Sequence, residues 1–176
     1  GTLNNAGTLK NYGALNNQSG ATLNNQSGAT LDNNDTLDNY GTVSFQSGST
    51  FDNTGGTLNN KAGGVIESYV DDLYFNIAGT VNLDANSEFI NHATMTNTGM
   101  LTNASTLTND DVLTNDDMLI NNGALNNDGT LTNDGLLENW SMLNNNGTLN
   151  NDDTLYNFDT LTNNSTLTND YHLTNF

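Results

Sequence analysis

The chain has 176 residues, of which 20 are acidic and 2 are basic, so its formal net charge is −18. This balance argues against nucleic acid and anionic membrane surfaces as partners, because both bind clustered lysine and arginine. The chain has no cysteine, which excludes disulfides and cysteine-ligated metal. No apolar run approaches the roughly 20 residues of a membrane-spanning helix, so no membrane insertion is expected.

Apolar residues in the first half recur at short, uneven intervals. Leu9 and Leu15 are six residues apart, whereas Leu23 and Leu31 follow at intervals of eight. The stretch NQSGATLNNQSGATLDN shows that the extra residues enter as Gln-Ser-Gly. Such residues favour corners, because they tolerate left-handed backbone or form local hydrogen bonds. Residues 61–92 are the most irregular and the most apolar, and we expect wide coils with bulky side chains there.

The second half has a strict period of six. From Phe89 onward every sixth residue is apolar, and an asparagine always stands two places after it. Because six is even, both residues keep to one side of an extended chain, whereas a helix of 3.6 residues per turn would scatter them. The pattern therefore predicts short strands joined by corners. The apolar series is Phe89, Met95, Leu101, Leu107, Leu113, Leu119, Leu125, Leu131, Leu137, Leu143, Leu149, Leu155, Leu161, Leu167 and Leu173.

Like residues recur at a spacing of 18, which indicates three hexapeptides per coil. A spacing of 12 breaks these series, and no hexapeptide can bury its apolar residue without stacked neighbours. We predict an all-β fold, a parallel β-solenoid (β-helix) with three-sided coils of about 18–24 residues, about nine in number. The chain is interpreted as a single array over 1–176, with wider irregular coils in 1–88 and strict hexapeptide coils in 89–176. The series are Asp116, Asp134, Asp152 and Asp170; Met100, Met118 and Leu136; and Trp140, Phe158 and Phe176.

The inward asparagines should lie in register along the axis. Stacked amides can bond to one another and to corner backbone groups, which avoids a cost of about 1–3 kcal/mol for each unpaired buried polar group. We therefore predict structural ladders and no catalytic role for these residues. They are Asn97, Asn103, Asn109, Asn115, Asn121, Asn127, Asn133, Asn139, Asn145, Asn151, Asn157, Asn163 and Asn169.

The phrases GTLNNAGTLKNYGALNN and GTLTNDGLL resemble repeats of filamentous-haemagglutinin-type proteins, large secreted bacterial exoproteins with β-solenoid shafts. The resemblance covers nearly the whole chain, although the motif is short. It implies a right-handed solenoid, export from the cell and an adhesive or structural use. The chain departs from that family in its stricter period, its many Asn and Asp residues and its lack of the Asn-Pro secretion motif. The residues alone leave the hand of the coil open.

The acidic series is the candidate metal site. Carboxylates one coil apart repel one another, and bound Ca²⁺, raised pKa values or simple solvation would offset that repulsion. Oxygen ligands without histidine or cysteine favour a hard cation, so Ca²⁺ is the one possible cofactor. A solvated acidic edge that keeps rods soluble is the alternative. The residues are Asp116, Asp134, Asp152 and Asp170, with Asp117 and Asp153 beside them.

Two further surfaces are predicted on the outside. An exposed apolar series usually marks a contact, so lateral association or docking of a neighbouring segment is expected there, with burial inside larger corner loops as the alternative. It comprises Met100, Met118, Leu136, Trp140, Phe158 and Phe176. A face of Thr-x-Thr pairs could bind ice, or could reflect the preference of threonine for exposed strands. It comprises Thr94, Thr96, Thr114, Thr130, Thr132, Thr148, Thr166 and Thr168.

The function expected from these patterns is that of a structural or adhesive shaft in an extracellular fibre or a cell-surface adhesin. The repeat reaches both ends, so the chain should continue in a longer protein or stack end to end with other copies. Expected partners are therefore copies of itself and a host or surface glycan or receptor. No catalysis is expected, since His92 and His172 are isolated in the sequence and neither a nucleophile elbow nor a phosphate loop is present.

Overall fold

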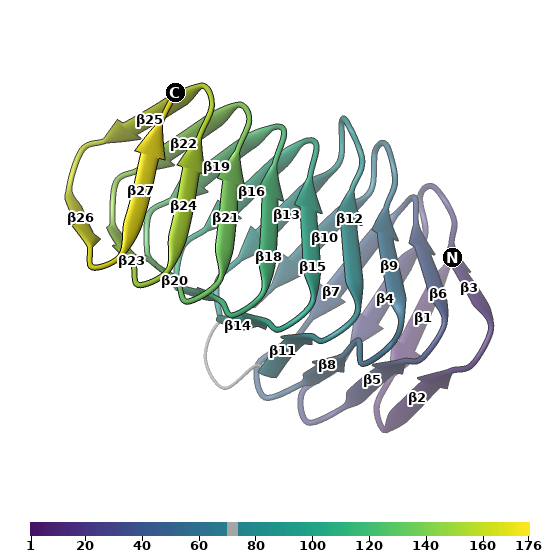
Figure 1. The fold of residues 1–176 in the computed structure, drawn as a ribbon. Coiled ribbons are helices and arrows are strands. Elements are labelled where there is room, and N and C mark those ends of the chain that lie inside the picture. The colour runs from purple at the N-terminus through teal and green to yellow at the C-terminus, as the bar shows by residue number, and fades with distance from the viewer. Residues whose placement is uncertain (70–73) are drawn as a thin grey trace.

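The computed structural model describes residues 1–69 and 74–176, which wind into a parallel β-solenoid without any helix (Figure 1). Three parallel sheets of nine strands form its walls, and each coil adds one strand to every sheet. Nine coils are thus stacked between the N-terminus at one end and the C-terminus at the other. The predicted all-β, three-sided fold is confirmed, while its right-handed winding stays a prediction. Within the described ranges, no helix is long and apolar enough to cross a membrane.

The three sheets, here called A, B and C, follow one another in every coil. Sheet A contains β1 (Thr2–Asn5), β4 (Thr22–Asn25), β7 (Thr42–Phe45), β10 (Val65–Ser68), β13 (Glu88–Asn91), β16 (Thr106–Asn109), β19 (Ala124–Asn127), β22 (Met142–Asn145) and β25 (Thr160–Asn163). Sheet B contains β2 (Thr8–Asn11), β5 (Thr30–Asn33), β8 (Thr50–Asp52), β11 (Tyr74–Ile77), β14 (Thr94–Asn97), β17 (Val112–Asn115), β20 (Thr130–Asn133), β23 (Thr148–Asn151) and β26 (Thr166–Asn169). Sheet C contains β3 (Ala14–Asn17), β6 (Thr36–Asn39), β9 (Thr57–Asn60), β12 (Thr80–Leu83), β15 (Met100–Asn103), β18 (Met118–Asn121), β21 (Leu136–Asn139), β24 (Thr154–Asn157) and β27 (His172–Asn175).

A typical strand points its second and fourth side chains inward. In β20, Leu131 and Asn133 are fully buried, while Thr130 and Thr132 are half-buried on the outer face. This alternation follows from the two-residue period of an extended chain. Complete burial of a leucine side chain stabilises the fold by about 1.5–3 kcal/mol. The leucine columns of the three sheets therefore make the core, and the outward residues are free to vary.

The number of residues per coil first rises along the chain and then falls. Asn5 bonds to Asn25, 20 residues away, and Thr50 pairs with Tyr74, 24 residues away. From β13 onward the spacing is 18, as in the bond from Asn91 to Asn109. The expected range of about 18–24 residues per coil is confirmed.

The bulky filling predicted for residues 61–92 is present as Phe75 and Phe89, and it extends to Phe45 and Phe51 in the preceding coil. Phe45, Phe51, Phe75 and Phe89 are fully buried. The Phe75 ring centroid lies 4.7–5.3 Å from those of the other three. These distances are typical of favourable aromatic packing. Residues 70–73, within the irregular 61–92 segment, lie outside the described residues.

The corners of the two halves differ in backbone conformation. Among the described residues, positive φ occurs only in the first half, at the larger corners. The two-residue corners of the strict repeat turn without left-handed backbone, and their N–H groups bond to the preceding coil, as from Asp134 N to Asn115 O at 2.8 Å. Left-handed backbone is therefore confirmed for the Gln-Ser-Gly corners of the first half and is not used at the two-residue corners of the strict repeat. The positive-φ residues are Gly20, Gly28, Gly48, Gly55, Gly63 and Asn86.

Candidate binding surfaces

The predicted asparagine ladders are present in all three sheets. Asn115 illustrates the geometry: its Nδ2 donates to Asn133 Oδ1 at 2.7 Å and to the Leu136 carbonyl at 3.0 Å. Its Oδ1 accepts from Asn97 Nδ2 at 2.7 Å. Both amide hydrogens and the oxygen are thus paired inside the core, which avoids the cost of a buried unpaired polar group. The ladders are structural, as the sequence predicts.

The ladders are interrupted together in the middle of the rod. In sheet A the inward positions are held by Phe45 and Ser68, in sheet B by Ile77 and in sheet C by Leu83. The fourth coil, formed by β10, β11 and β12, therefore has no asparagine at any of its three ladder positions. The sequence pattern missed this break, because the phase of residues 61–92 is ambiguous.

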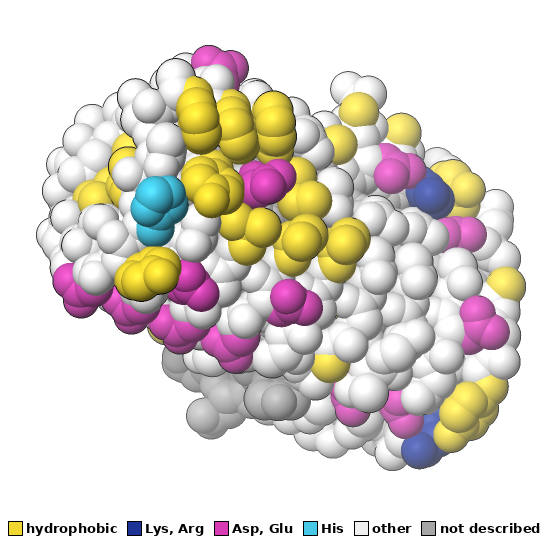
Figure 2. Space-filling view, in the orientation of Figure 1, with side chains coloured by type: hydrophobic (Ala, Val, Ile, Leu, Met, Phe, Trp, Pro, Cys, Tyr) yellow, Lys and Arg dark blue, Asp and Glu magenta, His cyan; other side chains and the backbone are white. Residues whose placement is uncertain are grey.

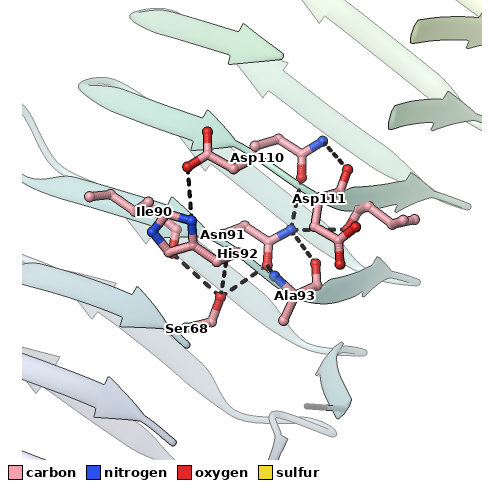
Figure 3. Close-up of polar contacts among 9 residues, drawn as sticks. Ser68, Ile90, Asn91, His92, Ala93, Asp110 and Asp111 are labelled. Carbon is pink, nitrogen blue, oxygen red and sulfur yellow. Dashed lines mark hydrogen bonds and ion pairs between the residues drawn. The ribbon is translucent and has the colours of Figure 1, made fainter. Parts of the chain in front are cut away.

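Ser68 starts the second ladder segment of sheet A. Its Oγ donates to Asn91 Oδ1 at 3.1 Å and accepts the backbone N–H of His92 at 3.0 Å (Figure 3). The imidazole of His92 lies at the surface, where Nδ1 is 2.8 Å from Asp110 Oδ2. His92 is therefore not isolated in the fold, although nothing near it in the sequence indicated a partner. The network joins one coil to the next.

The predicted acidic series lies at the corner between sheets B and C. The backbone register stacks the four aspartates of successive coils, and their side chains are exposed. Gly135 separates Asp117 from Asp153 in the adjoining position. Within the described parts of the chain, no three His, Cys, Asp or Glu residues are grouped so that they could hold a metal ion. Calcium binding stays a prediction. We call this the acid edge: Asp116, Asp117, Asp134, Asp152, Asp153 and Asp170.

The corner between sheets A and B distributes its charges differently. Asn146 Nδ2 donates to Asp128 Oδ1 at 2.8 Å, and Asn164 Nδ2 donates to Asn146 Oδ1 at 2.9 Å. In this column His92 precedes the carboxylates of Asp110 and Asp128, and Asn146 follows them. An outer amide ladder was not expected from the sequence. It shows that a stacked aspartate can receive a hydrogen bond where the next coil supplies asparagine.

The predicted apolar series lies on the outer face of sheet C and its corner with sheet A. Trp140 and Phe158 stack with centroids 3.9 Å apart, and Phe158 and Phe176 stack at 4.7 Å. Trp140 is 49% exposed, so burial within corner loops is ruled out. Figure 2 shows these side chains gathered beside the row of carboxylates. We call this surface the apolar strip: Met100, Met118, Ile120, Leu136, Trp140, Tyr156, Phe158 and Phe176.

The Thr-x-Thr pairs share the outer face of sheet B, as predicted. Thr96, Thr114 and Thr132 stand opposite one another in successive strands, and Thr130 pairs with Thr148. Val112 and Asn150 interrupt the two columns. The threonine face therefore extends from β14 to β26 with two gaps.

The chain matches no family model, no curated protein and no solved structure that it was compared with. The parallel solenoid of nine coils is that of a repeat protein, and the likeness to filamentous-haemagglutinin-type repeats rests on the short phrases alone.

Proposed function

We propose that residues 1–176 form part of the shaft of an extracellular fibre or a cell-surface adhesin, of bacterial type. The observation that carries this proposal is the continuous axial bonding of the three sheets, each of which joins every coil to the next, with inner ladders such as Asn115–Asn133–Asn151 adding to it on either side of the fourth coil. A fold built only from nearest-neighbour coils can be lengthened without changing its cross-section. The short phrases that resemble secreted adhesin repeats support the same function.

In the proposed shaft, the outer edges of the first and last coils pair with further coils. Leu3 in β1 is 47% exposed, and Leu161, Leu167 and Leu173 of the last coil are only partly buried. A further coil would cover these side chains and would pair with the backbone groups at the strand edges. The added coils belong either to the same chain or to another copy. A glycan or receptor at a host or other surface is the proposed distal partner.

Electron microscopy of the purified 176-residue protein tests the shaft. Nine coils at about 4.8 Å give a rod of about 43 Å, so end-to-end association should produce rods in multiples of that length. A covalent tandem of two copies is the matched control and should form one rod of twice the unit length. Immunogold labelling of the source cells then tests location. Compact particles from the tandem, or label confined to the cell interior, would contradict the proposal.

Ice binding is the second candidate function, favoured by the threonine columns of sheet B. The hydroxyl and methyl groups of Thr96, Thr114 and Thr132 repeat at the strand spacing of about 4.8 Å on one wall. Such a regular array can order water in a repeated arrangement.

Thermal hysteresis and ice-crystal shape test this second function. Thr114→Tyr places a ring in the middle of the threonine face and should abolish any activity. Thr108→Tyr, at the equivalent outward position of β16 in sheet A, is the control and should leave the activity unchanged. Unshaped ice crystals with the unmodified protein would exclude ice binding.

A further inference from the structure

A groove separates the acid edge from the apolar strip. Its volume is about 530 Å³. Asp117, Asp134 and Asp153 line one side of it. Met118 and Leu136 line the other side. The two walls have opposite chemical character, so the groove fits a group that is apolar along its length and cationic at its end.

Gly135 forms the floor of this groove. A Cβ at this position would lie 2.3 Å from the carbonyl oxygen of Asp117, so the two coils approach closely there. Tyr156 closes the groove on the side of the next coil. Lysine and arginine side chains have apolar stems and charged heads, and a tyrosine ring attracts a cation placed over its face. The groove therefore matches such a side chain from a partner.

The apolar strip continues from the groove across five strands of sheet C and its corner. The strands from β15 to β27 lie about 4.8 Å apart, so the strip is about 19 Å long. One face of an α-helix repeats about every 5.4 Å, close to this spacing, whereas an extended strand repeats about every 6.7 Å. Methionine adapts to varied partners, and the strip begins with Met100 and Met118. A helix about 13 residues long matches the strip.

A second copy of this chain is a poor occupant of the strip. The chain has only two basic residues besides histidine, and both are engaged in the first half. Lys10 lies 3.1 Å from Asp32, and Lys61 lies 3.3 Å from Asp84. A second copy would bring a further charge of −18 and no free lysine to the acid edge. The occupant must therefore be a different, basic polypeptide.

We propose that the apolar strip and the groove bind a basic amphipathic helix of a partner protein. Its apolar face lies on Met118, Leu136 and Trp140, and a Lys or Arg at its border enters the groove between Asp134 and Tyr156. This site is separate from the shaft function, since binding on the side wall does not involve the ends of the rod. Opposite charge speeds association, and the apolar contact supplies most of the affinity.

Trp140 provides the readout, because it is the only tryptophan of the chain and lies within the strip. The probe is a Leu/Lys peptide of about 14 residues with leucine along one helical face. A scrambled peptide of the same composition, with leucine distributed around the helix, is the control. The amphipathic peptide should shift the Trp140 emission to shorter wavelength and bind at least tenfold more tightly than the scrambled one. Equal binding of both peptides would overturn the proposal, since charge alone would then explain it.

Two double variants test the apolar side and the acidic side of the site separately. Met118→Thr with Leu136→Thr places the residue type of the equivalent position in β24 at both sites and should weaken binding tenfold or more. Asp134→Asn with Asp153→Asn should weaken binding about fivefold at low salt and less at high salt. Asp35→Asn with Asp111→Asn, away from the groove, is the charge control and should have little effect.

Two further results would overturn the assignment. One is unchanged affinity in the Met118→Thr, Leu136→Thr variant. The other is a sedimentation experiment in which the unmodified protein is a dimer that this variant converts to monomer, because the strip would then belong to a second copy. Identical sedimentation of the unmodified protein and this variant, together with a variant-sensitive peptide site, supports the proposal.

Discussion

The fourth coil and the five coils after it have different interiors within the same three walls. Each later coil places an asparagine at all three ladder positions, whereas the fourth has Ser68, Ile77 and Leu83. Its neighbourhood is filled by phenylalanine rings instead. The three-sided winding therefore does not require the ladders. The ladders in turn do not require the narrow coil, since they join the first coils at spacings of 20–22 residues and the last coils at a spacing of 18.

The first and largest prediction tests whether the phenylalanine side chains hold the interior of the wide coils together. Phe75 contacts three other buried rings, so Phe75→Ala leaves a large cavity. We expect a loss of about 4 kcal/mol in the free energy of unfolding, measured by urea denaturation followed by circular dichroism. Phe158→Ala, which removes a ring from the surface stack, is the control and should cost far less. Similar losses at both sites would contradict an interior held by the phenylalanine cluster.

The second prediction removes one amide from a narrow coil. Asn127→Ala leaves Asn109 Nδ2 and Asn145 Oδ1 without their ladder partner. Two unpaired buried groups and a small cavity should together lower the free energy of unfolding by about 3 kcal/mol. The outward neighbour Asn126, which accepts a bond from Asn144, supplies the matched control Asn126→Ala. That control should cost less than about 1 kcal/mol, and a reversed order would show that the inner ladder is not the stabilising one.

The third prediction sharpens the comparison by extending a ladder into the fourth coil. Ile77 lies in register between Asn53 and Asn97, so the amide introduced by Ile77→Asn has a partner on either side. We expect a loss of only about 1–2 kcal/mol. Ile66→Asn, at a core position between Val43 and Phe89, offers the amide no ladder and should cost clearly more. Thermal unfolding of both variants gives the order, and equal losses would refute the role of register.

The smallest effect concerns the two acidic corners. Asp134→Asn interrupts the column of exposed aspartates, as Asn146 does beside Asp128 at the other corner. Relief of repulsion should raise the free energy of unfolding by about 0.5 kcal/mol at low salt and by less in molar salt. Asp110→Asn removes the partner of His92 and should give no such gain. A gain at Asp110 that equals the gain at Asp134 would show that only the total charge matters.

The period of the sequence was enough to predict the three walls, the coil spacing and the inner ladders, because each depends on residue type at a fixed position. The placement of Asp134 above Asp116 and of Trp140 below Phe158 followed from the same register. Near Ile77 and Leu83 the insertions obscure the phase, so the interruption of the ladders could not be predicted.

The groove could also not be predicted from the sequence. It depends on the missing side chain of Gly135 between Asp117 and Asp153, and on how the outward side chains of neighbouring strands are oriented. The bond between His92 and Asp110 likewise joins residues that are 18 positions apart. Register could suggest that these two residues are close, but only the coordinates show that the side chains meet. Local conformation, rather than period, decides such contacts.

The ladder amides also give the rod a direction. Within the described residues, each bond between two asparagines of the inner ladders runs from Nδ2 of one coil to Oδ1 of the following coil, as from Asn97 to Asn115 and from Asn115 to Asn133. An amide carries a dipole of about 3.5 D, and parallel dipoles add along a column. The interior is thus electrically polar, with carbonyl oxygens toward the first coil and amide hydrogens toward the last. Any coil that joins the column must face the same way, so an inverted neighbour would be rejected at its centre as well as at its strand edges.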